Sequence, residues 1–114
     1  MGGLCGVISK EDCVSDLFFG TDYHSHLGTH RGGMVVLGEG GFQRSIHNIQ
    51  NAPFRSKFEN DFGRFSGNLG LGVISDTDPQ PLVMCSKLGT FGIVTVGLIT
   101  NIREIMDDLF RENS

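Results

Sequence analysis

The sequence predicts a single α+β domain, and three observations lead to this class. Segments with strand character and segments with helical spacing follow one another in the order β-α-β-β-α-β-β-β-α. Apolar residues make up 39% of the 114 residues, with nine Phe among them, which supports one hydrophobic core. Neither an internal repeat nor a linker divides the chain. We therefore predict one domain over residues 1–114.

The first third of the chain predicts a strand followed by helix. Residues 3–9 form a short apolar run, and Ser9 is the expected N-cap of the helix after it. The apolar side chains of that helix recur at helical spacing, at Val14, Leu17 and Phe18. Gly20 is expected to weaken the helix, and a second helical stretch over residues 21–27 is expected to end at Gly28.

The middle of the chain predicts a hairpin, a helix and a further strand. Residues 32–37 and 41–49 have strand character, and the Gly-Glu-Gly-Gly sequence between them is typical of a hairpin turn. Residues 52–62 predict a short helix, because three Phe recur at intervals of four: Phe54, Phe58 and Phe62. Residues 68–75 predict the next strand, and a turn follows at Asp-Thr-Asp-Pro.

The last third predicts two strands and a helix. Residues 81–86 and 91–99 have strand character, and the second segment is almost wholly apolar, so we expect a central strand buried on both faces. Thr100 or Asn101 is the expected cap of the final helix. Its apolar side chains share one face: Ile102, Ile105, Met106 and Leu109.

The composition excludes several classes of function. The net charge is −4 and the basic residues form no stripe, which argues against a nucleic-acid partner. No apolar run approaches the roughly 20 residues that cross a bilayer, and the N-terminal residues do not have the pattern of a secretory signal. The three cysteines form no Cys-x-x-Cys pair, which is typical of reduced thiols in a cytoplasmic protein.

Cys5 has two interpretations. If the chain is cleaved between Leu4 and Cys5, one residue carries both a thiol and a free α-amine. An α-amine has a pKa near ~8, so it can act as the general base that activates the sulfur. Alternatively, Cys5 is a small apolar side chain in a buried strand, because free cysteine is among the most buried residue types.

Three other polar groups also have a functional and a structural interpretation. The histidines His24, His26 and His30 suggest a metal site, but Gly28 interrupts the helix and no carboxylate follows at ligand spacing, so we predict none. Asp76 and Asp78 suggest a cation site, yet aspartate is also a preferred turn residue before proline. Arg31 lies beside two glycines, where a guanidinium can hold a carboxylate or order backbone carbonyls.

Several short motifs occur in an order that resembles a known family. They are Cys5-Gly6-Val7-Ile8, His30-Arg31-Gly32, Gly70-Leu71-Gly72, Gln80-Pro81-Leu82, and Gly97 before Ile99-Thr100-Asn101 and a helix. This order is similar to the first half of a class II glutamine amidotransferase domain of the amidophosphoribosyltransferase type. The resemblance covers nearly the whole chain. It implies the N-terminal part of a four-layer α-β-β-α sandwich, the N-terminal nucleophile (Ntn) hydrolase fold, with mostly antiparallel sheets.

The resemblance also implies an activity and a set of site residues. The family hydrolyses the side-chain amide of glutamine and passes the ammonia on for phosphoribosylamine synthesis in purine biosynthesis. Cys5 stands at the nucleophile position, and the backbone N–H of Gly97 at a position of the oxyanion hole. Substrate-binding positions fall on Arg31, Ser75 and Val96. The implied partners are glutamine and either a second copy in a homodimer or the remainder of a longer chain, with no metal and no organic cofactor.

Two of these positions depart from the family's pattern. Ser75 stands where the family has the arginine that grips the substrate carboxylate, and serine has no bidentate guanidinium. Val96 stands where the family has an asparagine that donates to the oxyanion, and loss of one such donor costs on the order of 10²–10³ in rate. The departures favour an impaired enzyme or, as the alternative, a non-catalytic regulatory or assembly domain with the same fold.

Overall fold

A computed structural model describes residues 2–27, 30–76, 79–97 and 101–113. It contains six strands, three α-helices and one short 3₁₀ helix within those ranges. A four-stranded antiparallel sheet has the order β1-β4-β2-β3 and consists of β1 (Gly3–Ile8), β2 (Arg31–Gly38), β3 (Gly41–Asn48) and β4 (Leu69–Ser75). A second, two-stranded sheet is the hairpin of β5 (Leu82–Ser86) and β6 (Gly89–Ile93). The predicted α+β class and its antiparallel sheets are confirmed.

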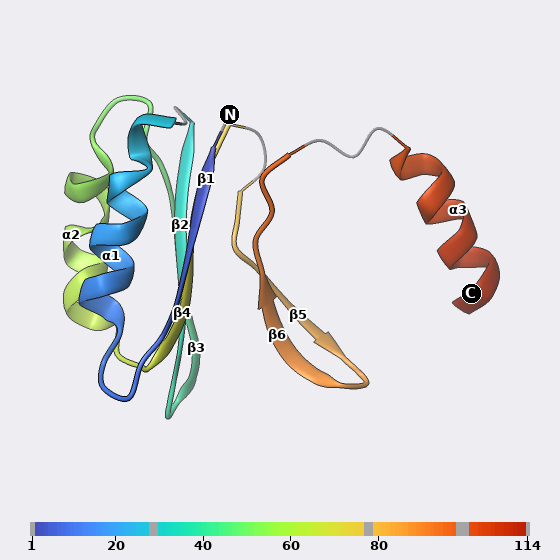
Figure 1. Cartoon of the computed structure of the whole chain (residues 1–114), viewed down its shortest axis with the longest axis horizontal. Coiled ribbons are helices and arrows are strands. Elements are labelled where there is room, and N and C mark those ends of the chain that lie inside the picture. Colours follow the sequence, from blue (N-terminus) through green and yellow to red (C-terminus); the bar gives the residue numbers. More distant parts are fainter. Residues whose placement is uncertain (1, 28–29, 77–78, 98–100, 114) are drawn as a thin grey trace.

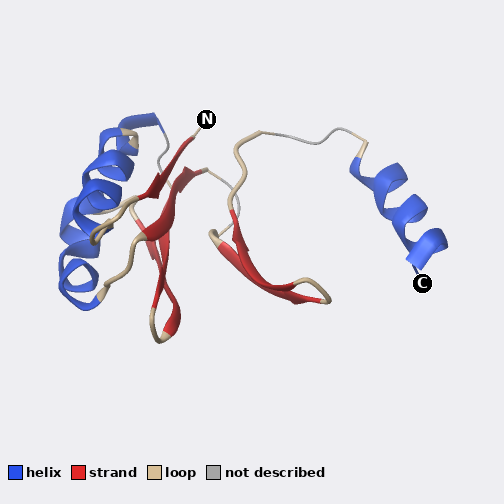
Figure 2. Cartoon of the chain, turned by 60° about the horizontal axis from the view of Figure 1, so that its bottom comes forward, coloured by secondary structure: helices blue, strands red, loops and turns tan. Residues whose placement is uncertain are grey.

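The elements lie in successive layers. Helices α1 (Val14–Tyr23) and α2 (Phe54–Arg64) cover one face of the four-stranded sheet, and the β5–β6 hairpin faces the other (Figure 1). Helix α3 (Ile102–Asn113) stands apart from the hairpin on its far side (Figure 2). No helix of the described residues is long and apolar enough to span a membrane.

The main hydrophobic core lies between the two helices and the four-stranded sheet. It contains side chains from α1, α2 and the central strands, among them Leu17, Met34, Phe58 and Ile74, each fully buried. The predicted spacing of phenylalanines on α2 is confirmed, because the rings of Phe54 and Phe58 stack with their centroids 4.3 Å apart. Burial of such side chains contributes about 1.5–3 kcal/mol each.

Helix α1 differs from the prediction at both ends. Its first turn is held by Asp12, whose Oδ1 accepts a hydrogen bond from the backbone N–H of Val14 at 2.9 Å, and not by Ser9. The helix also runs through Gly20 to Tyr23, and a 3₁₀ turn follows at Ser25–Leu27. Gly20 belongs in this helix because a Cβ there would lie 2.6 Å from the sulfur of Cys5. The predicted end at Gly28 lies outside the described residues.

The prediction of a central, doubly buried strand over residues 91–99 is wrong. Strand β6 ends at Ile93 and pairs with β5 alone. One face of the hairpin packs on the four-stranded sheet, where Gly92 lies against Val35. The other face is exposed, and its four large apolar side chains, Leu82, Met84, Phe91 and Ile93, are 39–49% accessible. A continuous apolar run is typical of a strand that is buried on both faces. The run does not reveal whether a second layer of the protein is present to cover the outer face.

Candidate functional site

Arg31 and Ser75 lie side by side at one end of the four-stranded sheet. They are directly opposite each other in the antiparallel pairing of β2 with β4, so their side chains project from the same face. This face is the one that packs against the hairpin, because Gly33 and Val35 belong to it. Ser75 is buried and Arg31 is half-buried. The structure therefore brings two of the predicted substrate-binding positions together.

The segment at Gln80–Pro81 connects the two sheets next to this pair. Gln80 lies so close to Gly33 that a Cβ on the glycine would be 1.7 Å from the carbonyl oxygen of Gln80. The buried side-chain amide of Gln80 accepts from the backbone N–H of Thr95 at 2.7 Å and donates to the Thr95 carbonyl at 3.1 Å. Gln80 thus fixes the chain just before Val96 and Gly97, the two predicted positions of the oxyanion hole.

Val96 and Gly97 directly follow Thr95, which is hydrogen-bonded to Gln80. Gln80 in turn lies against Gly33, two residues from Arg31 on β2. Val96 is 41% exposed and its side chain offers no hydrogen-bond donor. Gly97 has a φ of 141°, in the region that favours glycine. Its backbone N–H is a donor of the kind that can stabilise a developing negative charge.

Cys5 projects from the opposite face of the sheet. It is opposite Gly72 of β4, and its sulfur contacts Gly20 of α1 on the side covered by helices. Burial raises the pKa of the Cys5 thiol, and the carboxylate of Asp16 raises it further. The structure therefore does not bring the predicted nucleophile onto the face that carries Arg31 and Ser75.

The residues before Cys5 belong to strand β1. Gly3 pairs with Ile74 and Leu4 with Val73, while Gly2 lies against the carbonyl of Ile74. Leu4 projects from the face of Arg31 and Ser75 and is 47% exposed. These residues lie along the end of β4. Cleavage before Cys5 would remove them and leave that part of β4 unpaired on this side.

The histidines and aspartates of the loops do not form a metal site among the described residues. His30 lies 3.7 Å from Asp76 as an ion pair at the surface, next to Arg31. His24 packs on Gly3 at the end of α1. Asp78 lies outside the described residues.

The groove between the two sheets is mainly apolar, unlike the end of the four-stranded sheet that carries Arg31. It encloses about 280 Å³ and is lined mainly by apolar side chains, including Val35, Leu37, Phe42 and Leu71. It lies along the opposite ends of β2 and β4 from Arg31 and Ser75. An amino acid with two charged groups does not fit such a lining.

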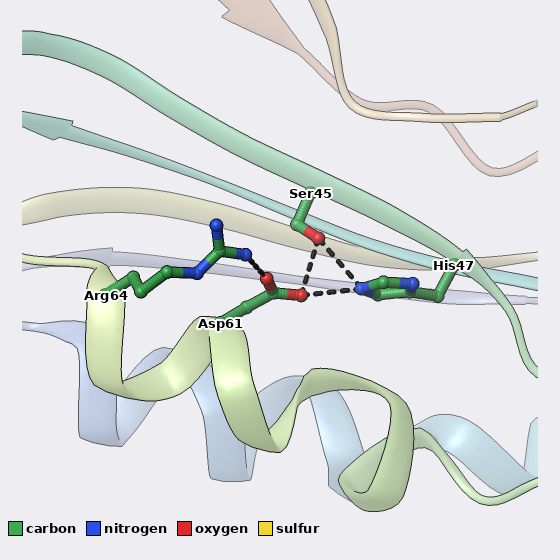
Figure 3. Close-up of polar contacts among 4 residues, drawn as sticks. All are labelled: Ser45, His47, Asp61 and Arg64. Carbon is green, nitrogen blue, oxygen red and sulfur yellow. Dashed lines mark hydrogen bonds and ion pairs between the residues drawn. The ribbon is translucent and has the colours of Figure 1, made fainter.

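A polar cluster around the buried Asp61 links β3 to α2 and was not predicted from the sequence (Figure 3). The carboxylate of Asp61 accepts from Ser45 Oγ and His47 Nε2, each at 2.6 Å, and pairs with Arg64. The same nitrogen, Nε2, lies 3.0 Å from Ser45 Oγ. A Ser-His-Asp catalytic relay uses the two imidazole nitrogens for the two partners, so this cluster is structural. The alternation of Ser45 and His47 on one strand face was the signal that could have revealed it.

The comparisons with known proteins agree with this architecture. No protein-family model and no curated protein sequence matches the chain. Among solved structures, glutamine phosphoribosylpyrophosphate (PRPP) amidotransferase from B. subtilis, in complex with ADP and GMP, matches with a TM-score of 0.80 and 18% identity. The match covers 100% of this chain and 26% of that chain, so this chain spans about a quarter of that enzyme's length. The predicted amidophosphoribosyltransferase-like domain is thereby confirmed as a fold.

Proposed function

We propose that the chain is a glutamine amidotransferase domain that works within or beside a longer protein. The observation that carries this proposal is the fold it shares, over its full length, with PRPP amidotransferase. The order of the Cys5-Gly6, Arg31-Gly32, Gln80-Pro81 and Gly97 motifs supports it independently. The ammonia released would be used to make phosphoribosylamine in purine biosynthesis.

The proposed reaction is hydrolysis of the glutamine amide. The thiolate of Cys5 attacks the amide carbon, and the backbone N–H of Gly97 donates to the oxyanion. Ammonia leaves with the proton that the α-amine of Cys5 took from the thiol, and a glutamyl thioester forms on the sulfur. Water then hydrolyses the thioester, which releases glutamate and restores the thiol. Arg31 pairs with the substrate carboxylate in place of the arginine that Ser75 replaces.

The proposed reaction requires that glutamine can reach the thiol of Cys5. Cleavage before Cys5 would remove the pairs that Gly3 and Leu4 make with β4. Cys5 would then be the first residue of a shortened edge strand, free to turn toward the Arg31 end of the sheet. Its new α-amine would provide the general base.

A second function, a non-catalytic binding or assembly domain, is favoured by a specific observation. The Cys5 sulfur faces α1 and its pKa is raised by burial, which disfavours the reactive thiolate. Serine in place of the family's arginine at the buried Ser75, and valine in place of its asparagine at the exposed Val96, point the same way.

Ammonia release from glutamine distinguishes the two functions. We expect the purified chain to release ammonia, the Cys5→Ser variant to release none, and the Cys85→Ser variant, altered at an exposed thiol, to match the parent. Intact mass measured with a glutamine-analogue electrophile should show a chain that begins at Cys5 with one adduct. A full-length mass without adduct and without ammonia release would instead establish the non-catalytic domain.

We also propose a second copy of this chain as a partner. The exposed face of the hairpin and the apolar face of α3 occur in the same molecule, and the α3 side chains Ile102, Ile105, Met106, Leu109 and Phe110 are 38–67% exposed. Monomeric proteins rarely leave contiguous apolar surfaces of this extent uncovered. A symmetric pair in which each α3 covers the partner's hairpin would bury both surfaces twice.

A further inference from the structure

Strand β1 lies at an edge of the four-stranded sheet, where it pairs with β4 alone. Directly after β1, the backbone N–H of Ser9 donates to the carbonyl of Asn68 at 2.8 Å, one step beyond the last pair of the β1–β4 register. Hydrogen-bonded and non-hydrogen-bonded pairs alternate along an antiparallel ladder. The backbone N–H and C=O groups of Leu4, Gly6 and Ile8 therefore point away from β4, and all three residues are exposed.

The outer edge of β1 lacks the features that protect free edges in other sheets, which are charged side chains, prolines and bulges. Its sequence, Gly-Leu-Cys-Gly-Val-Ile, contains no charged residue and no proline, and its register with β4 is continuous. On one face, Leu4 is 47% and Ile8 is 85% exposed. The other edge strand, β3, carries the polar side chains of Arg44 and His47. Of these two edges, β1 is the one that fits an added strand.

Helix α1 presents an acidic side chain beside β1. Gly20 contacts the sulfur of Cys5 and His24 packs on Gly3, so the helix runs antiparallel to the strand. Asp16 lies one turn before Gly20 on the same helix face. The carboxylate of Asp16 helps to raise the pKa of the Cys5 thiol. Asp16 is exposed and has no ion-pair partner within the described part of the chain. A cation on a strand next to β1 would therefore meet an unpaired carboxylate.

We propose that the outer edge of β1 binds an extended, basic segment of a partner polypeptide, which adds a strand to the sheet. Main-chain hydrogen bonds to Leu4, Gly6 and Ile8 provide the affinity, as in other cases of strand addition. Alternate side chains of the segment lie on opposite faces of the sheet. Those on the face of Leu4 and Ile8 are apolar, and a lysine or arginine on the helix-covered face pairs with Asp16.

A second copy of β1 is a poorer occupant of this edge. Two β1 strands that pair antiparallel around a twofold axis would place both α1 helices on the same face of the joined sheet. The two Asp16 side chains would then approach each other, and β1 offers no basic side chain to either. Like charges that face each other across paired strands are destabilising. A basic segment of another polypeptide has the opposite effect.

Binding of a defined peptide to the full chain tests the proposal. The probe is a capped synthetic peptide of about eight residues, within the length of typical strands, in which valine alternates with lysine. Fluorescence anisotropy of the labelled peptide gives the dissociation constant, and hydrogen exchange followed by NMR locates the bound peptide. We expect the peptide to slow exchange of the N–H groups of Leu4, Gly6 and Ile8, while the amides of β3 keep their exchange rates.

The charge of the peptide and the charge of Asp16 should both affect binding. A peptide in which valine alternates with glutamate should bind about tenfold more weakly or worse. Asp16→Asn should weaken binding of the lysine peptide by about two- to fivefold, because the ion pair is exposed to solvent. Added salt should reduce this difference. Asp22→Asn, at an acid of the same helix that pairs with Arg55, is the matched control and should bind as the parent does.

Gly6→Pro tests the main-chain hydrogen bonds. The substitution removes an outward N–H and leaves the hydrogen bonds to β4 in place, since proline is tolerated where the N–H of an edge strand faces solvent. We expect it to weaken binding of the lysine peptide by about tenfold or more. Gly6→Ala keeps the N–H and places a Cβ 3.4 Å from Leu71 Cδ2, an ordinary contact, so it should bind as the parent does.

Equal binding by the parent and by Gly6→Pro would overturn the proposal. Should Gly6→Pro not fold, a lysine peptide N-methylated at alternate residues removes the same kind of bond with the chain unaltered, and equal binding of the plain and methylated peptides would be equally decisive against it. Exchange at Leu4, Gly6 and Ile8 that slows with protein concentration in the absence of peptide would assign the edge to a second copy and would also refute the proposal.

Discussion

The buried carboxylate of Asp61 shows how one residue can connect a helix to a strand. Burial alone would raise the pKa of Asp61, but hydrogen bonds from Ser45, His47 and Arg64 outweigh it and hold the pKa below its ordinary value of 3.8. Asp61 is 2% exposed, whereas its partner Arg64 is 71% exposed, so solvent screens the ion pair with Arg64 more than the hydrogen bonds from Ser45 and His47. The folded chain therefore stabilises the ionised form of Asp61 more than the unfolded chain does.

Replacement of this carboxylate should destabilise the fold. Asp61→Asn leaves donors of Ser45, His47 and Arg64 without their charged acceptor, and we expect a loss of about 1–3 kcal/mol in the free energy of unfolding. Urea unfolding at neutral pH measures the loss. Asp108→Asn, which removes an exposed partner of Arg111, is the matched control and should change stability little. Equal effects of the two variants would contradict the assigned role.

Acid should remove the same contribution. Because the folded-state pKa of Asp61 is lowered, its stabilisation is present above the unfolded value of 3.8 and is lost as the pH falls through the lower folded value. The parent should therefore lose more stability than Asp61→Asn between neutral pH and pH values below 3.8. Urea midpoints of both proteins over that range test this. Parallel pH dependence would show that other groups carry the acid sensitivity.

Single residues of the candidate site were predictable to different degrees. The Arg31 and Ser75 positions follow from motif order, and the antiparallel pairing of β2 with β4, which was not predicted, places them directly opposite each other. The face from which Cys5 projects depends on which of residues 3–9 begins pairing with β4, and an apolar run does not define that register.

At the scale of elements, close backbone approach holds the hairpin to the four-stranded sheet. Gly33→Ala places a Cβ 1.7 Å from the carbonyl oxygen of Gln80, so the Gln80–Pro81 segment must move. We expect a loss of about 1–3 kcal/mol, typical of overpacking, measured by urea unfolding.

A second glycine provides the control for that substitution. Gly63 lies in α2 and nothing is within 4 Å of its Cβ position. Gly63→Ala should therefore stabilise the chain by about 0.5–1 kcal/mol. A destabilised Gly63→Ala would mean that the loss in Gly33→Ala reflects alanine itself and not the contact.

The elements themselves were predicted well where periodicity and turn chemistry agree. The β2–β3 hairpin is an example, because its glycine turn and both strand segments point to the same structure. The segment after Ile93 was predicted wrongly, since the side chain of Gln80 takes the backbone groups of Thr95 that a longer strand would use. A hydrogen bond to a side chain fifteen residues away cannot be predicted from the hydropathy pattern of the segment itself.

At the scale of the whole molecule, the uncovered apolar surfaces predict association. A helix of 12 residues is marginal alone, so α3 gains stability when its apolar face is covered. Ile105→Asp with Leu109→Asp should weaken the proposed dimer by about tenfold or more, measured by sedimentation equilibrium. Ile8→Asp, at a side chain 85% exposed on β1, is the control and should leave the association unchanged. A parent that sediments as a monomer at every concentration would refute the second copy as partner.

The narrow attachment of the β5–β6 hairpin has a consequence for how the native state opens. The hairpin pairs with no strand of the four-stranded sheet and rests on it through Gln80–Pro81 and Gly92, whereas β4 is hydrogen-bonded on both sides, to β1 and to β2. Loss of those few contacts would free the hairpin as a unit while the larger sheet stays intact. In native-state hydrogen exchange, the amides of β5 and β6 would then exchange together, at a lower opening free energy than the amides of β4, as a separate cooperative unit of the fold.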